Sequence, residues 1–235
     1  MAADNLLKVL QDAGLGSRRK LSEAIFNGRV IVNGTVVEDL RYPVIREKDE
    51  VSLDGKLVSL LTEKHTYIVL NKPEGILSAV RDDRGRKTVI DILPSKYQQM
   101  NLHPVGRLDK ESTGLLLLTN DGDLTYCLTH PKFEHEKEYL VQADGILTHK
   151  EITALQQGLE LDDGKTYPAR VKEITDTPPY RYSIIIHEGR KRIVRRMFAK
   201  LGYRIPALKR VRMGRLKLGN MEEGEVREVE VSEII

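Results

Sequence analysis

The apolar positions at the start of the chain predict two short helices. The apolar residues within 5–13 follow a helical rather than an alternating spacing, and Gly14 and Gly16 end the pattern. A second helix is expected from Ser17, a favourable N-cap residue, to about Asn27, because Gly28 then interrupts the pattern.

Two hairpins are expected next. The β-rich runs of residues 30–37 surround Asn33-Gly34, and those of residues 51–58 surround Asp54-Gly55. Asn-Gly and Asp-Gly between β-rich runs are typical of two-residue hairpin turns. Two helices and two hairpins in about sixty residues predict a small α/β domain.

The pattern then changes to longer elements. Residues 67–70 predict a compact strand, and the wholly apolar run 115–118 predicts a strand that is buried on both faces. A polar loop, residues 107–114, precedes that strand. Residues 61–66 fit a linker, so we expect an α+β protein with domains at 1–61 and 62–235.

A later segment predicts a helix with two unlike faces. Its apolar residues recur at helical spacing, and they are Ile193, Val194, Met197, Phe198 and Leu201. The arginines on its other side are Arg192, Arg195 and Arg196. Such a helix can anchor in a core while it presents arginines to a site or to phosphate.

Composition excludes several classes of protein. The 235 residues are 40% apolar and 31% charged, which excludes a membrane protein, a collagen-like chain and a fully disordered chain. The single cysteine, Cys127, cannot pair within the chain, so we expect a reducing compartment, the cytoplasm. No secretory signal is expected at the N-terminus.

The charge is concentrated in one segment. Residues 181–217 hold 13 Lys and Arg against one acid, Glu188, a charge of +12 in a chain whose net charge is +3. A stripe of this kind is the electrostatic footprint of a polyanion site. The alternative is a solvated helix face, but so large an excess favours a nucleic acid.

A second basic cluster lies at the predicted start of the second helix. Arg18, Arg19 and Lys20 oppose the helix dipole there, whereas a phosphate at that end would interact favourably with them. The pattern fits a phosphate contact and a tolerated surface cluster equally well.

The loop before the buried strand contains Asp109, two residues after Arg107. A loop held by a rigid strand suits a catalytic carboxylate, but a turn aspartate that caps its own backbone fits the same pattern. Cys127, His130 and His135 have no usual zinc-ligand spacing, so no metal is expected.

Two resemblances change this picture. Gly16-Ser17-Arg18-Arg19 and residues 28–34 resemble the small RNA-binding domain that is named after ribosomal small-subunit protein S four. The long run of residues 106–122 resembles the signature of the RsuA family of ribosomal RNA pseudouridine synthases. Further blocks of that family occur in the right order, at residues 71–75, 137–139, 188–198 and 208–214. Lys191 and Ile193 depart from the family pattern.

The resemblance implies a catalytic domain with a mixed, largely antiparallel sheet flanked by helices. It also implies roles for named residues. Asp109 acts at the ribose, Arg195 pairs with its carboxylate, and Tyr139 stacks on the flipped base. Arg107 enters the space that the base vacates, and Leu208 packs on the uracil. The other residues assigned to RNA binding are Arg18, Arg19, Lys20, Lys72, Arg190, Arg192 and Arg196.

The function implied is isomerisation of uridine to pseudouridine in ribosomal RNA, in a stem-loop of the large subunit. A small-subunit target, a non-catalytic ribosome-assembly factor and a hydrolase that releases the base are the alternatives. The reaction has no redox step, so no cofactor is expected. The expected partner is ribosomal RNA, with no membrane, and the protein is expected to be a monomer.

Overall fold

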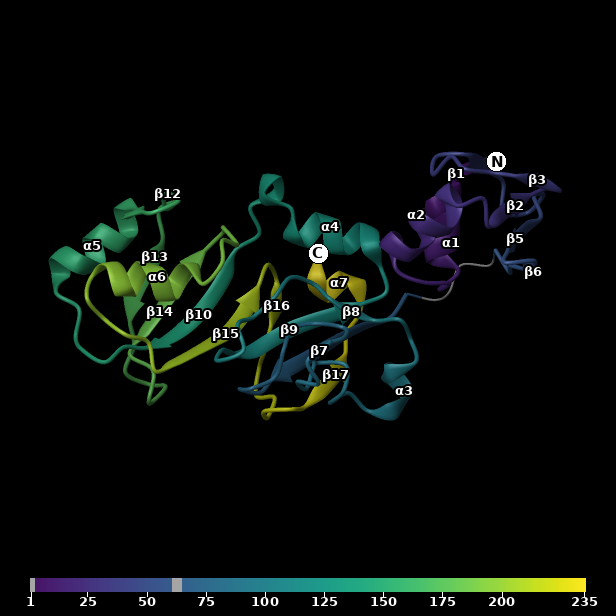
Figure 1. Cartoon of the computed structure of the whole chain (residues 1–235). Coiled ribbons are helices and arrows are strands. Elements are labelled where there is room, and N and C mark those ends of the chain that lie inside the picture. Colours follow the sequence, from purple (N-terminus) through teal and green to yellow (C-terminus); the bar gives the residue numbers. More distant parts are fainter. Residues whose placement is uncertain (1–2, 61–64) are drawn as a thin grey trace. The chain divides into compact units, whose positions relative to one another are not determined.

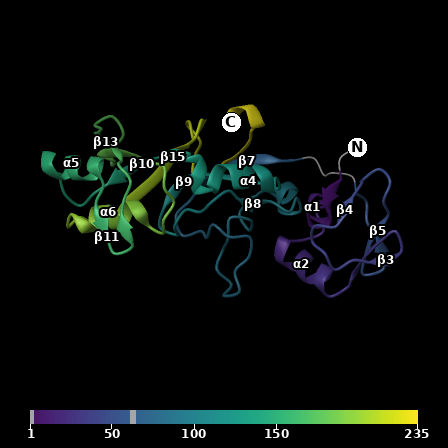
Figure 2. The same cartoon turned by 90° about the horizontal axis from the view of Figure 1, so that it is seen from above.

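The computed structural model describes residues 3–60 and 65–235, and the chain forms two compact units, residues 1–65 and 66–235 (Figures 1 and 2). The predicted domain boundary at residue 61 and most of the predicted linker fall on residues 61–64, outside the described residues. That boundary therefore stays a prediction. Among the described residues, no helix combines the length and the apolar character that a membrane span requires.

The first unit has the predicted helices and hairpins. Its core joins one face of each helix to the inner face of a sheet with the order β3-β2-β5-β6. The Ser17 hydroxyl accepts a hydrogen bond from the Lys20 amide, as expected of an N-cap. The elements are β1 Asp4–Asn5, α1 Leu6–Asp12, α2 Arg18–Phe26, β2 Val30–Val32, β3 Thr35–Val36, β4 Pro43–Val44, β5 Val51–Leu53 and β6 Lys56–Leu57.

The two hairpin turns adopt the backbone that their sequences predict. Asn33 and Gly34 have φ values of 48° and 79°, and Asp54 and Gly55 have 53° and 73°. Two successive left-handed residues give the turn a twist that matches the flanking strands. Both predicted hairpins, β2–β3 and β5–β6, are confirmed.

The second unit is built on a nine-stranded sheet. The strand order is β13-β14-β10-β15-β9-β7-β17, with β16 paired to β15 and β8 paired to β9. Every pair is antiparallel except β9 with β15. The predicted fold class, with a mixed and largely antiparallel sheet, is confirmed.

Helices lie along both halves of this sheet. In Figures 1 and 2, α5 and α6 lie near β13, β14 and β10, while α4 and α7 lie near β8 and β9. The strands are β7 Tyr67–Lys72, β8 His103–Pro104, β9 Thr113–Thr119, β10 Lys137–Gln142, β11 Glu160–Leu161, β12 Gly164–Lys165, β13 Arg170–Glu173, β14 Tyr182–Ile186, β15 Ala207–Met213, β16 Leu216–Lys217 and β17 Val226–Glu228. The helices are α3 Ser95–Gln98, α4 Gly122–Thr129, the 3-10 turn η1 Pro131–Phe133, α5 His149–Gln157, α6 Ile193–Lys200 and α7 Val231–Ile234.

Strand β9 is buried on both faces, as its sequence predicts. Leu116 and Leu118 belong to the core on one side of the sheet, and Leu115 and Leu117 belong to a separate core on the other side. All four side chains are fully buried. The strand is therefore held firmly, and the loop that leads into it starts from a fixed point.

Gly114 allows β9 and β15 to approach each other closely. Its φ is +102°, and a Cβ atom there would lie only 2.7 Å from the Arg210 amide nitrogen, too close for any side chain. Because the obstacle is backbone, it cannot swing aside. Glycine at this position brings the loop before β9 next to β15.

Replacing Gly114 tests this close approach. We expect Gly114→Ala to destabilise the second unit by roughly 2–4 kcal/mol, because it adds an unfavourable φ to overpacking. The midpoint of thermal unfolding measures the effect. Gly122→Ala is the matched control, since a Cβ at Gly122 meets nothing within 4 Å. Equal midpoints for the two variants would contradict the close approach.

Candidate active site

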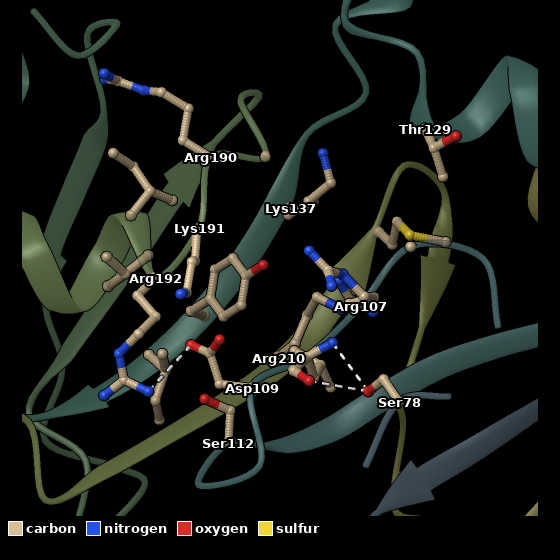
Figure 3. A pocket seen from close by; sticks show the side chains of 18 of the residues that line it. Ser78, Arg107, Asp109, Ser112, Thr129, Lys137, Arg190, Lys191, Arg192 and Arg210 are labelled. Atoms are coloured by element: carbon tan, nitrogen blue, oxygen red, sulfur yellow. Dashed lines mark hydrogen bonds and ion pairs between the residues drawn. The ribbon is translucent and has the colours of Figure 1, made fainter. Parts of the chain in front are cut away.

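A cavity of about 520 Å³ opens in the second unit (Figure 3). Its lining comes from the loop after β8, from β10, from the segment between β14 and α6, and from β15. The predicted site residues that line it are Arg107, Asp109, Tyr139, Arg190, Arg192 and Leu208. Residues from distant parts of the chain thus meet in one place, as the resemblance implies.

Hydrogen bonds fix the start of the loop that carries Asp109. Ser78 Oγ accepts from the Leu108 amide at 3.1 Å and donates to the Leu108 carbonyl at 2.9 Å. The Ser112 amide donates to the Asp109 carbonyl at 3.0 Å. The Asp109 side chain itself remains 28% exposed, so its carboxylate is accessible from the cavity.

Lys72 holds the next part of this loop. Its ammonium donates to the carbonyls of Pro73 at 2.9 Å, Lys110 at 3.4 Å and Ser112 at 2.8 Å. The side chain is 0% exposed, and burial lowers the pKa of Lys72 to about 8. An ammonium has three donors, so these bonds leave none for RNA. The contact of Lys72 with RNA stays a prediction, and this burial does not favour it.

The cation beside Asp109 is Arg192 rather than Arg195. Arg192 Nη1 lies 4.0 Å from Asp109 Oδ2, as the dashed line in Figure 3 marks, and 2.7 Å from Glu111 Oε2. The Arg192 guanidinium holds the pKa of Glu111 below its usual range. Arg192 can reach the cavity because it precedes α6, with a left-handed backbone at φ 53°.

Arg195 instead binds backbone oxygens. Its guanidinium donates to the Glu111 carbonyl at 3.0 Å and to the Ile205 carbonyl, and lies 3.4 Å from Ser112 Oγ. Within residues 3–60 and 65–235 it forms no ion pair with Asp109, so the implied pair is not formed in this structure. Arg195 joins α6 to the loop two residues beyond the carboxylate.

Two other arginines of the basic segment are paired within the protein. Asp163, in the turn between β11 and β12, bonds Arg190 at 2.8 Å and Arg196 at 2.8 Å. Arg190 also bonds Glu188 at 2.6 Å. The +12 segment is therefore partly neutralised by an acid that lies outside it. Both arginines tie the α6 region to the β11–β12 turn, and their contact with RNA stays a prediction.

The apolar and aromatic residues of the site come from neighbouring strands. Tyr139 on β10 and Leu208 on β15 are 8% and 5% exposed. Arg107 is exposed at the cavity's edge. Arg18, Arg19 and Lys20 belong to the first unit, where all three are exposed in the first turn of α2.

Sequence reasoning gave no role to two further residues of the cavity, Lys137 and Arg210. Strand alternation could have found them. Lys137 and Tyr139 are two apart on β10, and Leu208 and Arg210 are two apart on β15, so each pair shares a face of the sheet. Tyr139 and Arg210 are also register partners.

Family comparisons agree with this geometry. The family described as RNA pseudouridylate synthase matches residues 66–200, and the S4 domain family matches residues 5–58. A crystal structure of a pseudouridylate synthase superposes with a TM-score of 0.68 at 33% identity, and the match covers 97% of each chain.

Two relatives match along most of their length. The chain is 42% identical over 210 residues to ribosomal large subunit pseudouridine synthase B of Bacillus subtilis, covering 88% of this chain and 84% of the relative. It is 38% identical over 209 residues to an uncharacterized RNA pseudouridine synthase of Aquifex aeolicus, covering 88% and 82%. The chain therefore belongs to the RNA pseudouridylate synthase family.

Proposed function

We propose that this protein converts one uridine of large-subunit ribosomal RNA to pseudouridine, with Asp109 acting at the ribose. The observation that carries the proposal is the accessible Asp109 carboxylate in a cavity that Tyr139 and Arg192 also line. The choice of the large subunit follows the name of the Bacillus subtilis relative.

The reaction exchanges one bond for another. The bond from C1′ to N1 of uracil breaks, a bond from C1′ to C5 forms, and a proton passes from C5 to N1. The target base must leave its stack to enter the cavity. A carboxylate at the sugar can serve as nucleophile or base, as in retaining glycosidases. No electrons are gained or lost, so we expect no cofactor.

The side chains around Asp109 have complementary roles in this proposal. Arg192 places a positive charge beside the carboxylate. Tyr139 stacks on the extruded base, a contact that contributes roughly 1–3 kcal/mol in single-stranded RNA complexes. Leu208 packs on the uracil, and Arg107 enters the space that the base leaves. Arg195 and Lys72 are positioning residues, because they bond the loop backbone.

The first unit adds a second RNA contact. Arg18, Arg19 and Lys20 surround the N-terminus of α2, where free amides and basic side chains suit a phosphate. We further propose that the protein works as a monomer in the cytoplasm, where its proposed substrate would lie.

Replacing the carboxylate tests the chemistry. We expect Asp109→Asn to lower the rate of pseudouridine formation at least about a thousand-fold, while RNA affinity changes little. The rate is measured on ribosomal RNA with purified protein. Asp176→Asn, on an exposed turn, is the matched control. An Asp109→Asn variant with the wild-type rate would remove Asp109 from the mechanism, and release of free uracil would favour a hydrolase.

A map of the pseudouridines in ribosomal RNA identifies the uridine that the protein modifies. We expect RNA from a strain that lacks the protein to miss one pseudouridine in the large subunit. A site missing only from the small subunit would correct the choice of RNA. A complete set of sites in both subunits would support a non-catalytic assembly factor.

The basic cluster of α2 has its own test. We expect Arg18→Gln with Arg19→Gln to weaken RNA binding and to lower the salt slope of log K by about 1 for each phosphate that is no longer neutralised. The rate at saturating RNA should not change. Lys56→Gln, on the exposed β6, is the control with the same kind of charge removal. An unchanged salt slope would place the RNA elsewhere.

A further inference from the structure

Two basic side chains of the cavity have no part in the mechanism above. Lys137 projects from β10, and Arg210, which is 1% exposed, projects from the adjacent β15. Figure 3 shows both on the side of Asp109 that faces away from Arg192. Tyr139, which is proposed to stack on the base, is the register partner of Arg210. Lys137 and Arg210 therefore lie next to the position proposed for the base.

The acids of the cavity are already engaged by other groups. Seven basic and three acidic side chains line it, and the acids are Asp82, Asp109 and Glu188. Asp82 pairs with Arg86 at 2.6 Å. Asp109 lies beside Arg192, and Glu188 accepts from Arg190 and from the Tyr167 amide. In the described residues neither Lys137 nor Arg210 forms an ion pair, and Glu188, whose charge acts on Lys137, is held by Arg190.

Both side chains keep unused hydrogen-bond donors. Arg210 Nε donates to the Leu115 carbonyl at 2.8 Å, but its Nη2 is buried and has no partner in the described residues. Lys137 Nζ has a hydrogen bond to the His135 carbonyl at 3.2 Å. Burial, and then the charge of Arg210, lower the pKa of Lys137 to about 8.

A buried guanidinium nitrogen without a partner is unfavourable and points to a ligand. Two neighbouring cations with free donors bind an acceptor that carries negative charge more strongly than a neutral one. Uracil and ribose are uncharged, so in RNA only a phosphodiester supplies it.

We propose that Lys137 and Arg210 form a phosphate subsite that binds the non-bridging oxygens of a phosphodiester adjacent to the target uridine. The subsite rests on the proposed function, because it fixes the backbone of the same nucleotide whose base enters the cavity. It would hold the sugar at Asp109 while the base turns, since the base is detached from the ribose at that stage.

Neutral linkages in the RNA test this subsite. A stem-loop with the target uridine is made with a methylphosphonate at one linkage at a time, which removes one charge. We expect a single linkage, next to the target, to lower the affinity of wild-type protein about ten-fold or more. Lys137→Met should lower the affinity for unmodified RNA similarly, with little further loss from that methylphosphonate.

Two further variants keep the outcome unambiguous. Lys137→Arg retains a charge and should restore sensitivity to the same linkage. Lys191→Met removes a charge from the same cavity and should leave that sensitivity unchanged. Arg210 is left intact, since its bond to Leu115 also supports the fold. The subsite would be overturned if the affinity losses from Lys137→Met and from the methylphosphonate simply added at every linkage. A Lys137→Met variant with wild-type affinity would overturn it as well.

The readout separates this inference from the proposed function. Affinity is measured in the Asp109→Asn background, so the coupling between Lys137 and one linkage does not depend on turnover. Absence of pseudouridine with the wild-type protein would refute the proposed function while the coupling stayed measurable. Normal turnover without any coupling would refute the subsite alone.

Discussion

Hydrogen bonds from three basic side chains to one stretch of backbone determine how this site is built. The side chains come from β7, α6 and β15, and they bond carbonyls within residues 110–115. Loop carbonyls near a core lack strand partners and need donors from elsewhere, and charged donors form the stronger bonds. The three cations are Lys72, Arg195 and Arg210. Lys72 and Arg195 attach the loop with Asp109 to β7 and α6, and Arg210 attaches the start of β9, directly after the loop, to β15.

This attachment divides the basic residues into groups with different tasks. The backbone-bonding group orders the loop, and Arg192 stands beside the carboxylate. Arg190 and Arg196 share Asp163 and join α6 to the β11–β12 turn. Lys137 retains unused donors toward the cavity, and so does Arg210, which belongs to both groups. Many of the basic side chains thus form bonds within the protein, and only some of them remain available to bind RNA.

Much of this could be predicted from sequence, because hairpin turns, the doubly buried strand and the long signature around Asp109 are local patterns. The failures concern partners that are distant in the chain. Helical spacing placed Arg192 and Arg195 on one side, but α6 begins at Ile193, so Arg192 lies outside the helix. Lys72 was assigned to RNA binding, and nothing local in the sequence reveals the three carbonyls that its ammonium bonds. Asp163 lies outside the basic segment 181–217, and it neutralises the charges of Arg190 and Arg196 within that segment.

The most direct test of the attachment is the single-turnover rate of Lys72→Met at saturating RNA, in protein whose circular dichroism spectrum matches the wild type. Methionine keeps the length of the chain but donates nothing to the Lys110 and Ser112 carbonyls. A small misplacement of a catalytic group lowers rates about 100-fold. We expect a loss of about that size with RNA affinity within about two-fold of wild type. Weaker RNA binding with an unchanged rate on bound RNA would contradict the account.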